Sequence, residues 1–594
     1  MNKHRRMNLI LRFFKGSKRF FIIAVLASLA TTILNALIPQ IFRFTIDSVL
    51  GGDGYKYLAS HLWVMSLLLI GVALLSGGAL FLTRTCTAKS GENFAKNLRD
   101  ALFSHVQRLP MKWHDRHQTG DIIQRCTSDV EVIRNFVLTQ FLEVFRTVFI
   151  VVVSFGMMLS MNVKLSLLTL IFVPIVVLYS TIFYRLIAKR FTIADEAEGE
   201  LSTVVQENAT GVRVVRAFGR EKFEMERFRE KNEGFARLWI RLGTLSGLYW
   251  GIGDLITGLQ VVTVIVAGAI EAVSGSITVG EFIAFASYNT TLVWPVRGLG
   301  RILSDMSKAG VSFERMEYIL NAKEEDYSEK EIYNKEVRRE TENHEIAFSH
   351  VNFAYDTEKQ VLKDVDFIIP QGSVFGILGG TGSGKSTIIQ LLNRLYELGD
   401  EDGKVTVGGR NVKKVPLEWL RKNVGMVLQE PFLYSRTIRE NIAASVPGAT
   451  MEEIREAAKI ACVDEAIMNF VDGYDTLVGE RGVTLSGGQR QRIAIARMLL
   501  QKTPIMVFDD SLSAVDSETD SRIRKALLQN RKQTTIILIS HRITTLMNAD
   551  QIMVLHQGRI EELGTHKELI GQQGIYRRIY DIQMSQDDRM QVEE

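Results

Sequence analysis

Long apolar runs in the first half of the chain predict helices that span a membrane. A helix needs about 20 mostly apolar residues to cross the hydrocarbon core of a bilayer. Six stretches meet this requirement: residues 20–40, 61–82, 142–161, 165–187, 245–273 and 279–303. Beyond residue 345 no apolar run is long enough to span a bilayer. The pattern therefore predicts a domain of six spans, followed by a domain outside the membrane.

The loops between these spans differ in length and charge. The loops after the second and fourth spans are long and rich in Arg and Lys, whereas the other three are short and hold few basic residues. Basic residues concentrate in cytoplasmic loops, so both long loops and both termini are expected in the cytoplasm. Apolar residues at helical spacing predict that residues 88–109 and 198–235 extend the spans as helical stalks.

Short segments at the tips of the two stalks, about residues 113–125 and 211–221, are candidates for contact with another domain. The plain alternative is that they are turns of helical hairpins that touch no partner. The membrane half of the sequence does not decide between these two interpretations.

Several polar residues lie within the predicted spans: Glu143, Arg146, Asp254, Asn289 and Arg297. Ionisable side chains inside a bilayer are costly and often functional. They can also lie at membrane edges or hydrogen-bond between helices and hold them together. For each residue taken alone, the structural role is the favoured interpretation.

Composition separates the chain from several other classes of protein. Its 594 residues exceed what one hydrophobic core usually holds, which predicts more than one domain. The net charge is only +4, and no basic patch with interleaved aromatic residues indicates nucleic-acid binding. The three cysteines, Cys86, Cys126 and Cys462, are far apart and fit no metal-site spacing, so they are expected to be reduced thiols.

A phosphate-binding loop lies in the second half of the chain. A buried strand at 371–378 leads into a glycine-rich loop and then a helix, which is the setting this motif requires. Backbone amides of such a loop surround the phosphates, Lys385 is expected to contact the β- and γ-phosphates, and Ser386 to bind Mg²⁺. The predicted nucleotide contacts are Gly379, Gly380, Thr381, Gly382, Ser383, Gly384, Lys385, Ser386 and Thr387.

A second buried strand, at 505–508, ends in the pair Asp509 and Asp510. A carboxylate at a strand end is what a magnesium–nucleotide site needs on its far side. The pair alone would be a weak signal. Downstream of a phosphate-binding loop it predicts that Asp509 is a magnesium ligand.

The chain resembles the ATP-binding cassette superfamily over nearly its whole length. The decisive motif is Leu485-Ser486-Gly487-Gly488-Gln489, which matches the family signature without change. The resemblance implies that Ser486, Gly487, Gly488 and Gln489 bind the γ-phosphate of a nucleotide held by an opposing cassette. Two cassettes would then enclose two ATP molecules. Six spans with long cytoplasmic stalks, fused ahead of the cassette, resemble an exporter.

The resemblance assigns expected roles to further residues. Tyr355 resembles the aromatic residue that stacks on adenine, and Gln429 the glutamine that contacts Mg²⁺ and the attacking water. His541 resembles the switch histidine on the γ-phosphate. Residues 513–516 resemble the loop that crosses the dimer seam, and residues 476–482 the exporter segment that meets the stalk tips. In this family the stalk tips would be coupling helices.

One position departs from the family pattern. The family places Glu after the strand-end Asp, to polarise the attacking water, and this chain has Asp510 there. The shorter side chain predicts slow turnover at the chain's own site, with ATP and Mg²⁺ binding preserved. Since the signature is intact, the favoured assembly is a heterodimer with a partner half that carries Glu, as in the multidrug exporters of Gram-positive bacteria. Two alternatives remain: a homodimer in which Asp510 works, and a non-transporting ATP-gated regulator.

These observations predict an all-α six-helix transmembrane domain followed by an α/β phosphate-loop cassette with a helical subdomain. The expected boundaries are 1–310 for the membrane domain, 311–344 for a linker, 345–582 for the cassette and 583–594 for a polar tail. The predicted function is ATP-driven export of amphipathic drugs or lipids. The predicted location is the bacterial cytoplasmic membrane, with the cassette and both termini in the cytoplasm. The catalytic candidates are Asp510, His541 and Gln429, and the magnesium candidates Ser386, Gln429 and Asp509.

Overall fold

The computed structural model describes residues 12–50, 58, 61–325, 344–356, 359–479, 482, 484–511, 517–529 and 534–592. The predicted seam-crossing loop, 513–516, lies outside the described residues, as do parts of the predicted linker and of the segment 476–482. The chain forms two compact units. One comprises Met1–Arg108 and His117–Ala322, and the other comprises Leu109–Arg116 and Lys323–Glu594. The domain boundaries given above stay predictions.

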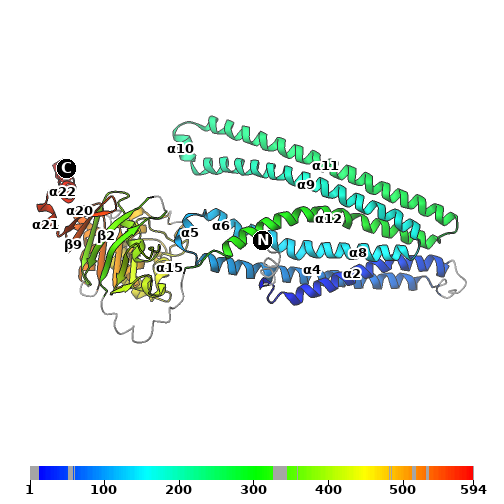
Figure 1. Cartoon of the computed structure of the whole chain (residues 1–594), viewed down its shortest axis with the longest axis horizontal. Helices are drawn as coiled ribbons and strands as arrows, with labels where there is room; N and C mark the ends of the chain where they lie inside the picture. The colour runs from blue at the N-terminus through cyan, green and yellow to red at the C-terminus, as the bar shows by residue number, and fades with distance from the viewer. Residues whose placement is uncertain are drawn as a thin grey trace. The chain divides into compact units, whose positions relative to one another are not determined.

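Long helices make up the first unit (Figure 1). They are α2 (Lys18–Phe44), α4 (Trp63–Val106), α8 (Phe141–Leu159), α9 (Val163–Thr210), α11 (Glu221–Val273) and α12 (Val279–Leu320). Helix α2 continues into the π-helical turn η1 (Thr45–Leu50). Polar caps fix two of the starts, because Asn162 accepts a hydrogen bond from the Leu165 amide and Thr278 forms a capping box with Glu281.

Five helical segments of the described chain are long and apolar enough to cross a membrane: Lys18–Leu50, Trp63–Val106, Thr119–Leu159, Val163–Thr210 and Glu221–Val273. They contain the first five predicted spans, except that the second span was predicted to begin two residues earlier and the third to end two residues later. The sixth predicted span lies in α12, which is one continuous helix but is not among these five. Its polar residues, such as Asn289 and Arg297, lower its apolar content, and it packs against α2, α8, α9 and α11.

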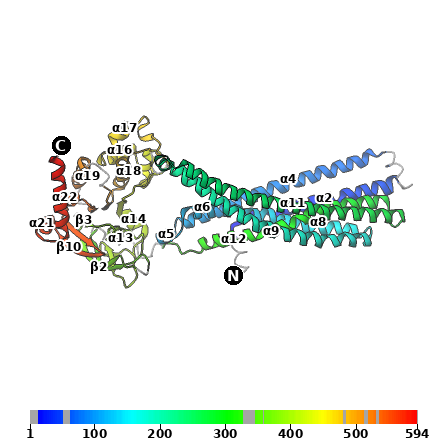
Figure 2. The ribbon, with the colours of Figure 1, turned by 90° about the horizontal axis from the view of Figure 1, so that it is seen from above.

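The predicted stalks are helical. Helix α4 runs without a break to Val106, and α9 and α11 extend far beyond their apolar windows. Short helices follow α4: α5 (Met111–Asp115), α6 (Thr119–Cys126), α7 (Ser128–Arg134) and the π-helical turn η3 (Asn135–Gln140). The second stalk turns at α10 (Val212–Ala217), which joins the ends of α9 and α11 in both views (Figures 1 and 2).

Two sheets form the centre of the second unit. The antiparallel sheet has the order β2-β1-β4-β5, with β1 (Ile346–Phe353), β2 (Leu362–Ile369), β4 (Lys404–Val407) and β5 (Arg410–Asn411). The larger sheet has the order β10-β9-β3-β8-β7-β6. Its strands are β3 (Val374–Gly379), β6 (Val424–Val427), β7 (Ile505–Asp509), β8 (Thr535–Ile539), β9 (Gln551–His556) and β10 (Arg559–Gly564). All neighbours in it are parallel except β9 and β10.

Helices cover the larger sheet. They are α13 (Lys385–Leu392), α14 (Leu417–Asn423), α15 (Ile438–Ile442), α16 (Met451–Ile460), α17 (Asp464–Met468), α18 (Gly487–Leu500), α19 (Ser517–Gln529), α20 (Ile543–Leu546), α21 (His566–Gly571) and α22 (Ile575–Val592). Stacked rings of Phe348, Phe367 and Phe375 join the two sheets, with centroids 4.7 and 5.4 Å apart. A second core packs α15–α18 against the sheet. The predicted fold class, a helical membrane domain followed by an α/β cassette, is confirmed.

Candidate nucleotide-binding site

The topology of the larger sheet brings the predicted site residues to one edge. Strands β3, β8, β7 and β6 are neighbours and run parallel, so their carboxyl ends lie together. The phosphate-binding loop follows β3, His541 follows β8, Asp509 ends β7, and Gln429 follows β6. Ligands of parallel sheets bind at this edge. The fold therefore gathers residues that are about 160 positions apart in sequence, with no special packing needed to bring them together.

The phosphate-binding loop has the backbone geometry that its glycines allow. Gly382 and Gly384 have φ angles of +77° and +106°, which residues with a Cβ rarely adopt. A Cβ on Gly384 would also lie 2.6 Å from Leu362 Cδ2. The buried Ser383 hydroxyl has no hydrogen-bond partner among the described residues. An orphaned hydroxyl in this loop fits a bound phosphate oxygen.

Lys385 lies across the loop at the start of α13. Its Nζ donates hydrogen bonds of 2.8 Å to the carbonyl oxygens of Gly379 and Gly380. Burial lowers the pKa of Lys385, while the nearby carboxylates of Asp509 and Asp510 oppose that shift. An ammonium group held in place by two carbonyl oxygens can exchange them for the charged oxygens of a phosphate.

Asp509 is buried beside Ser386. Burial raises the pKa of the Asp509 carboxyl, and the hydrogen bond from Ser386 together with the charges of Lys385 and His541 opposes the rise. The charge of Asp510 acts in the same direction as burial. The Ser386 hydroxyl and the Asp509 carboxylate are thus adjacent oxygen donors, which is the ligand chemistry that Mg²⁺ prefers.

Asp510 has a left-handed backbone conformation, with φ of +45°. Its amide donates a hydrogen bond of 2.9 Å to the Ile539 carbonyl, so the turn after β7 is tied to the end of β8. Asp tolerates this conformation better than most residues that carry a Cβ. The carboxylate is half-buried and acts electrostatically on both Lys385 and Asp509. No pattern in the sequence predicts this backbone strain.

Gln429 and His541 are exposed at the same edge of the sheet. Gln429 lies in the segment after β6, and Gln491 of α18 donates a 3.3 Å hydrogen bond to the neighbouring Leu428 carbonyl. The His541 carbonyl accepts a 2.7 Å hydrogen bond from Gln583 of α22. Both side chains are therefore carried on segments that other helices hold in place.

Tyr355 follows β1 and packs against α13. Its hydroxyl lies 2.9 Å from Thr387 Oγ1 and donates a 2.5 Å hydrogen bond to Gln390 Oε1. The Tyr355 ring meets the Tyr396 ring edge-on, with centroids 4.9 Å apart. Tyr396 in turn donates a hydrogen bond to Asp115 of α5, and Arg116 forms a 2.6 Å ion pair with Asp356. The first predicted coupling segment thus reaches the predicted adenine-stacking residue within one compact unit.

The signature motif forms the start of α18. Ser486 is the N-cap, and it forms a capping box with Gln489 through hydrogen bonds of 3.3 and 2.9 Å. The amides of Gly487 and Gly488 lie in the first turn, where a helix attracts anions. This is the geometry expected of a phosphate-binding turn.

A hydrogen-bond network that was not predicted from the sequence links the signature helix to the segment after Gln429. The Arg497 guanidinium donates hydrogen bonds to the Asn441 carbonyl at 2.8 Å, to the Phe432 carbonyl at 2.9 Å and to Asn441 Oδ1 at 3.1 Å. Burial lowers the pKa of Arg497. The available signal was an Arg inside the apolar run that ends α18, because buried arginines are almost always paired.

The polar residues of the predicted spans are paired between helices. Arg297 of α12 is buried and forms a 2.7 Å ion pair with Asp254 of α11. Gln260 donates a 2.7 Å hydrogen bond to Asn289, and Arg301 lies 3.5 Å from Glu143. These contacts support the structural interpretation for Asp254, Asn289 and Arg297. Arg146, by contrast, has no ion pair among the described residues.

The three cysteines are free thiols. Cys86 is buried, and Cys126 and Cys462 are partly buried. These properties agree with the expected structural role.

Comparison with known proteins identifies the family. Residues 21–296 match the ABC transporter transmembrane region and residues 362–513 the ABC transporter family. The chain is 35% identical over 567 residues to YknU of Bacillus subtilis, an "uncharacterized ABC transporter ATP-binding protein", covering 95% of both chains. It is 31% identical to YgaD of the same organism, a "putative multidrug export ATP-binding/permease protein", covering 97% of this chain and 99% of the relative.

A solved structure has the same fold. The structure of a bacterial Atm1-family ABC exporter with ATP bound superposes with a TM-score of 0.82, at 25% identity, over 95% of this chain and 99% of that one. The chain therefore belongs to the ABC transporters, as an exporter half with its membrane domain and cassette fused. It is a membrane protein whose cassette binds nucleotide and couples ATP hydrolysis to export.

Proposed function

We propose that this chain is the catalytically weaker half of a heterodimeric exporter of amphipathic small molecules. The observation that carries the proposal is Asp510, which stands where the family places Glu, directly after Asp509 and beside the phosphate-binding loop. The rest of the nucleotide site has the residues and geometry for binding. The combination favours a site that holds ATP and hydrolyses it slowly.

The nucleotide roles follow from the geometry of the sheet edge. Tyr355 would stack on adenine, the amides of Gly379–Ser386 would surround the phosphates, and Lys385 would exchange its two carbonyl partners for phosphate oxygens. Ser386, Gln429 and Asp509 would hold Mg²⁺, which neutralises phosphate charge when bound. His541 would contact the γ-phosphate from the end of β8.

Asp510 is too short for the role that Glu plays at this position. One missing methylene withdraws the carboxylate by roughly 1 Å, and a displacement of that size can cost on the order of 10²-fold in rate. Its backbone is tied to Ile539, so the turn resists a shift that would restore the reach. This supports slow turnover at the chain's own site.

The intact signature gives the chain a role in a second site. Ser486, Gly487, Gly488 and Gln489 would bind the γ-phosphate of ATP held by the partner half, which would supply the catalytic Glu. The exposed apolar residues of the second stalk tip, Val214 at 61% and Phe218 at 76%, support docking of α10 on a second cassette.

The proposed location is the bacterial cytoplasmic membrane, with the cassette and both termini in the cytoplasm. The basic residues of the two long loops support this orientation. Multidrug export in the printed name of YgaD supports an amphipathic cargo of drug or lipid type.

Two variants of this chain, co-purified with the partner half, test the proposal. Ser486→Ala removes a γ-phosphate contact from the partner's site and is expected to lower ATP hydrolysis by the pair about tenfold or more. Asp510→Asn alters only the weak site and is expected to lower hydrolysis less than twofold. Loss of hydrolysis with Asp510→Asn would instead show that Asp510 works as a catalytic carboxylate and would contradict the weak-site proposal. Transport of a fluorescent amphiphile by reconstituted vesicles separates an exporter from a regulator.

A further inference from the structure

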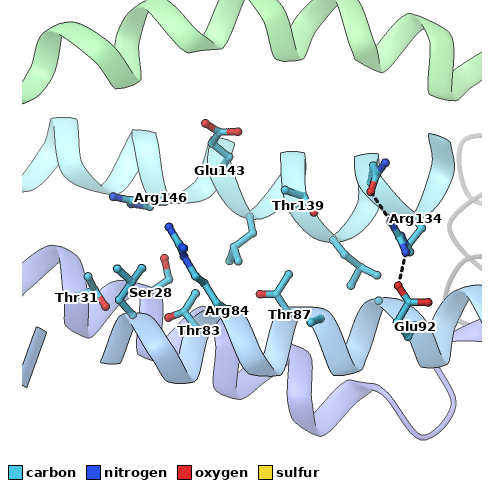
Figure 3. A pocket seen from close by; sticks show the side chains of 16 residues that line it. Ser28, Thr31, Thr83, Arg84, Thr87, Glu92, Arg134, Thr139, Glu143 and Arg146 are labelled. Carbon is cyan, nitrogen blue, oxygen red and sulfur yellow. Dashed lines mark hydrogen bonds and ion pairs between the residues drawn. The ribbon is translucent and has the colours of Figure 1, made fainter. Parts of the chain in front are cut away.

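A cavity in the helical unit has an excess of positive charge. Its volume is about 440 Å³, and α2, α4, the end of α7, η3 and α8 line it. Three arginines and two glutamates are among its lining residues: Arg84, Arg134, Arg146, Glu92 and Glu143 (Figure 3). The way these charges pair decides what the cavity can bind.

Two of the three arginines have no counter-ion in the part of the chain that the structure describes. Arg134 is paired with Glu92, and also with Glu131 at 2.7 Å. Glu143 points away from the cavity in Figure 3, and its carboxylate lies 3.5 Å from Arg301. Arg84 reaches from α4 toward α8, where Arg146 lies, and neither has an ion pair among the described residues.

Neighbouring like charges repel unless an anion lies between them. Arg84 and Arg146 therefore favour an anionic ligand, and guanidinium groups bind phosphate and carboxylate through paired hydrogen bonds. The hydroxyls of Ser28, Thr83 and Thr139 also line the cavity. Thr87 Oγ1 is buried in its wall and has no hydrogen-bond partner among the described residues. This wall is polar enough to hold the oxygens of a head group.

The surroundings favour an amphiphile over a free anion. Leu80, Leu138 and Leu142 give the same cavity an apolar lining. Arg84 lies two residues after the second predicted span, and Arg146 lies near the start of the third, which places the charges at a membrane boundary. Arg146 also lines a second cavity of about 260 Å³ with Trp250 and Trp294, where an apolar body could lie.

We propose that Arg84 and Arg146 bind the anionic phosphate or carboxylate head of a membrane amphiphile in this cavity. The ligand's apolar part contacts the leucines of the wall. If that ligand is cargo, the cavity is where cargo first binds, and this last step rests on the proposed export function. Binding itself needs no ATP, so it is tested separately from transport.

Binding to the purified full chain in detergent, without nucleotide, tests the proposal. The probes are short-chain phosphatidylglycerol, short-chain phosphatidylcholine and glycerol phosphate, with affinity measured by native mass spectrometry. Phosphatidylglycerol is expected to bind most tightly, and Arg84→Gln and Arg146→Gln each to weaken it about tenfold or more. Arg185→Gln is the matched control, because Arg185 is exposed on α9 and lines neither cavity. It is expected to change the affinity less than twofold.

The probes also separate the possible sources of the anion. If glycerol phosphate binds as tightly as phosphatidylglycerol, the claim that the ligand is an amphiphile is overturned. Equal binding of phosphatidylcholine, or equal effects of the three substitutions, would overturn the arginine site altogether.

Arginine labelling of the unmodified chain gives a result even where a variant fails to fold. Phosphatidylglycerol is expected to protect Arg84 and Arg146 from phenylglyoxal at least threefold relative to Arg185. Equal labelling of the three arginines with and without the lipid would contradict the proposal.

Discussion

The phenol of Tyr396 donates a hydrogen bond to the carboxylate of Asp115, a residue 281 positions earlier in the sequence. Burial and this carboxylate together raise the pKa of Tyr396, so the phenol stays protonated at any physiological pH. Tyr396 also touches the ring of Tyr355. A motion of α5 would therefore be transmitted through Tyr396 to Tyr355, the predicted adenine contact.

Tyr396→Phe is expected to loosen α5 without disturbing the cassette core. The hydrogen bond is partly exposed, so its loss is expected to cost about 1 kcal/mol. This would raise the equilibrium constant for local opening of α5 about fivefold. Hydrogen exchange of the Met111–Asp115 amides in the full chain measures this directly. Tyr580→Phe is the control, since the Tyr580 ring lies on His566, away from α5. Equal exchange rates in both variants would show that the bond does not hold α5.

Asp509→Asn is expected to stabilise the nucleotide-free chain increasingly as pH rises. The folded-state pKa of Asp509 lies above its usual 3.8, so the folded chain binds more protons there than the unfolded chain. Stability is then lost as pH rises from 3.8 through the raised pKa, and Asn removes that loss. At pH 7 the melting temperature of the Asp509→Asn variant should exceed that of the unmodified chain by a few degrees. Each kcal/mol gained in the free energy of unfolding raises it by roughly 2–4 °C.

The same variant is expected to weaken magnesium-dependent ATP binding, because it removes a carboxylate from the predicted metal site. Asp472→Asn, at an exposed position, is the matched control and is expected to change neither property. If the difference in melting temperature between Asp509→Asn and the unmodified chain did not depend on pH, burial of the charged Asp509 carboxylate would not be what destabilises the chain.

Gly253→Ala is expected to disturb the buried ion pair of the membrane domain. A Cβ at this position would lie 2.3 Å from Arg297 Nη2, and Arg297 is fixed by Asp254 and by the ring of Trp250 at 4.6 Å. Overpacking of this kind typically costs about 1–3 kcal/mol. Thermal unfolding of the full chain in detergent measures the loss.

Gly258→Ala, on the same helix, is the matched control. Nothing lies within 4 Å of a Cβ at Gly258, so the better helix propensity of Ala is expected to leave stability equal or slightly raised. Similar losses of thermal stability for both substitutions would mean that the loss comes from reduced helix flexibility and not from disturbance of the Arg297–Asp254 ion pair.

Much of the cassette could be predicted from local sequence. The strand predicted at 505–508 is β7, and the glycine-rich loop lies between β3 and α13 as its motif requires. These features depend on short-range patterns, namely a run of apolar residues and glycines at fixed spacing. The helical stalks were predictable for the same reason, because amphipathic spacing persists over many turns.

Features that depend on tertiary contact could not be predicted. The pairing of Arg297 with Asp254 joins two helices, and sequence alone left a functional role open for both residues. The left-handed conformation of Asp510 depends on a hydrogen bond to the end of β8. The sixth span is supported by packing of α12 against its neighbours and not by its composition, which is too polar for an apolar run alone to define.

ATP hydrolysis by the purified chain alone, compared with its Asp510→Glu variant, tests the central claim most directly. The unmodified chain is expected to bind ATP and hydrolyse it slowly, and Asp510→Glu to raise the rate on the order of 10²-fold, provided the chain pairs with a second copy. Glutaraldehyde cross-linking of the same sample establishes that pairing. Brisk hydrolysis by the unmodified chain, with no gain from Asp510→Glu, would contradict the account of Asp510 as a weak catalytic carboxylate.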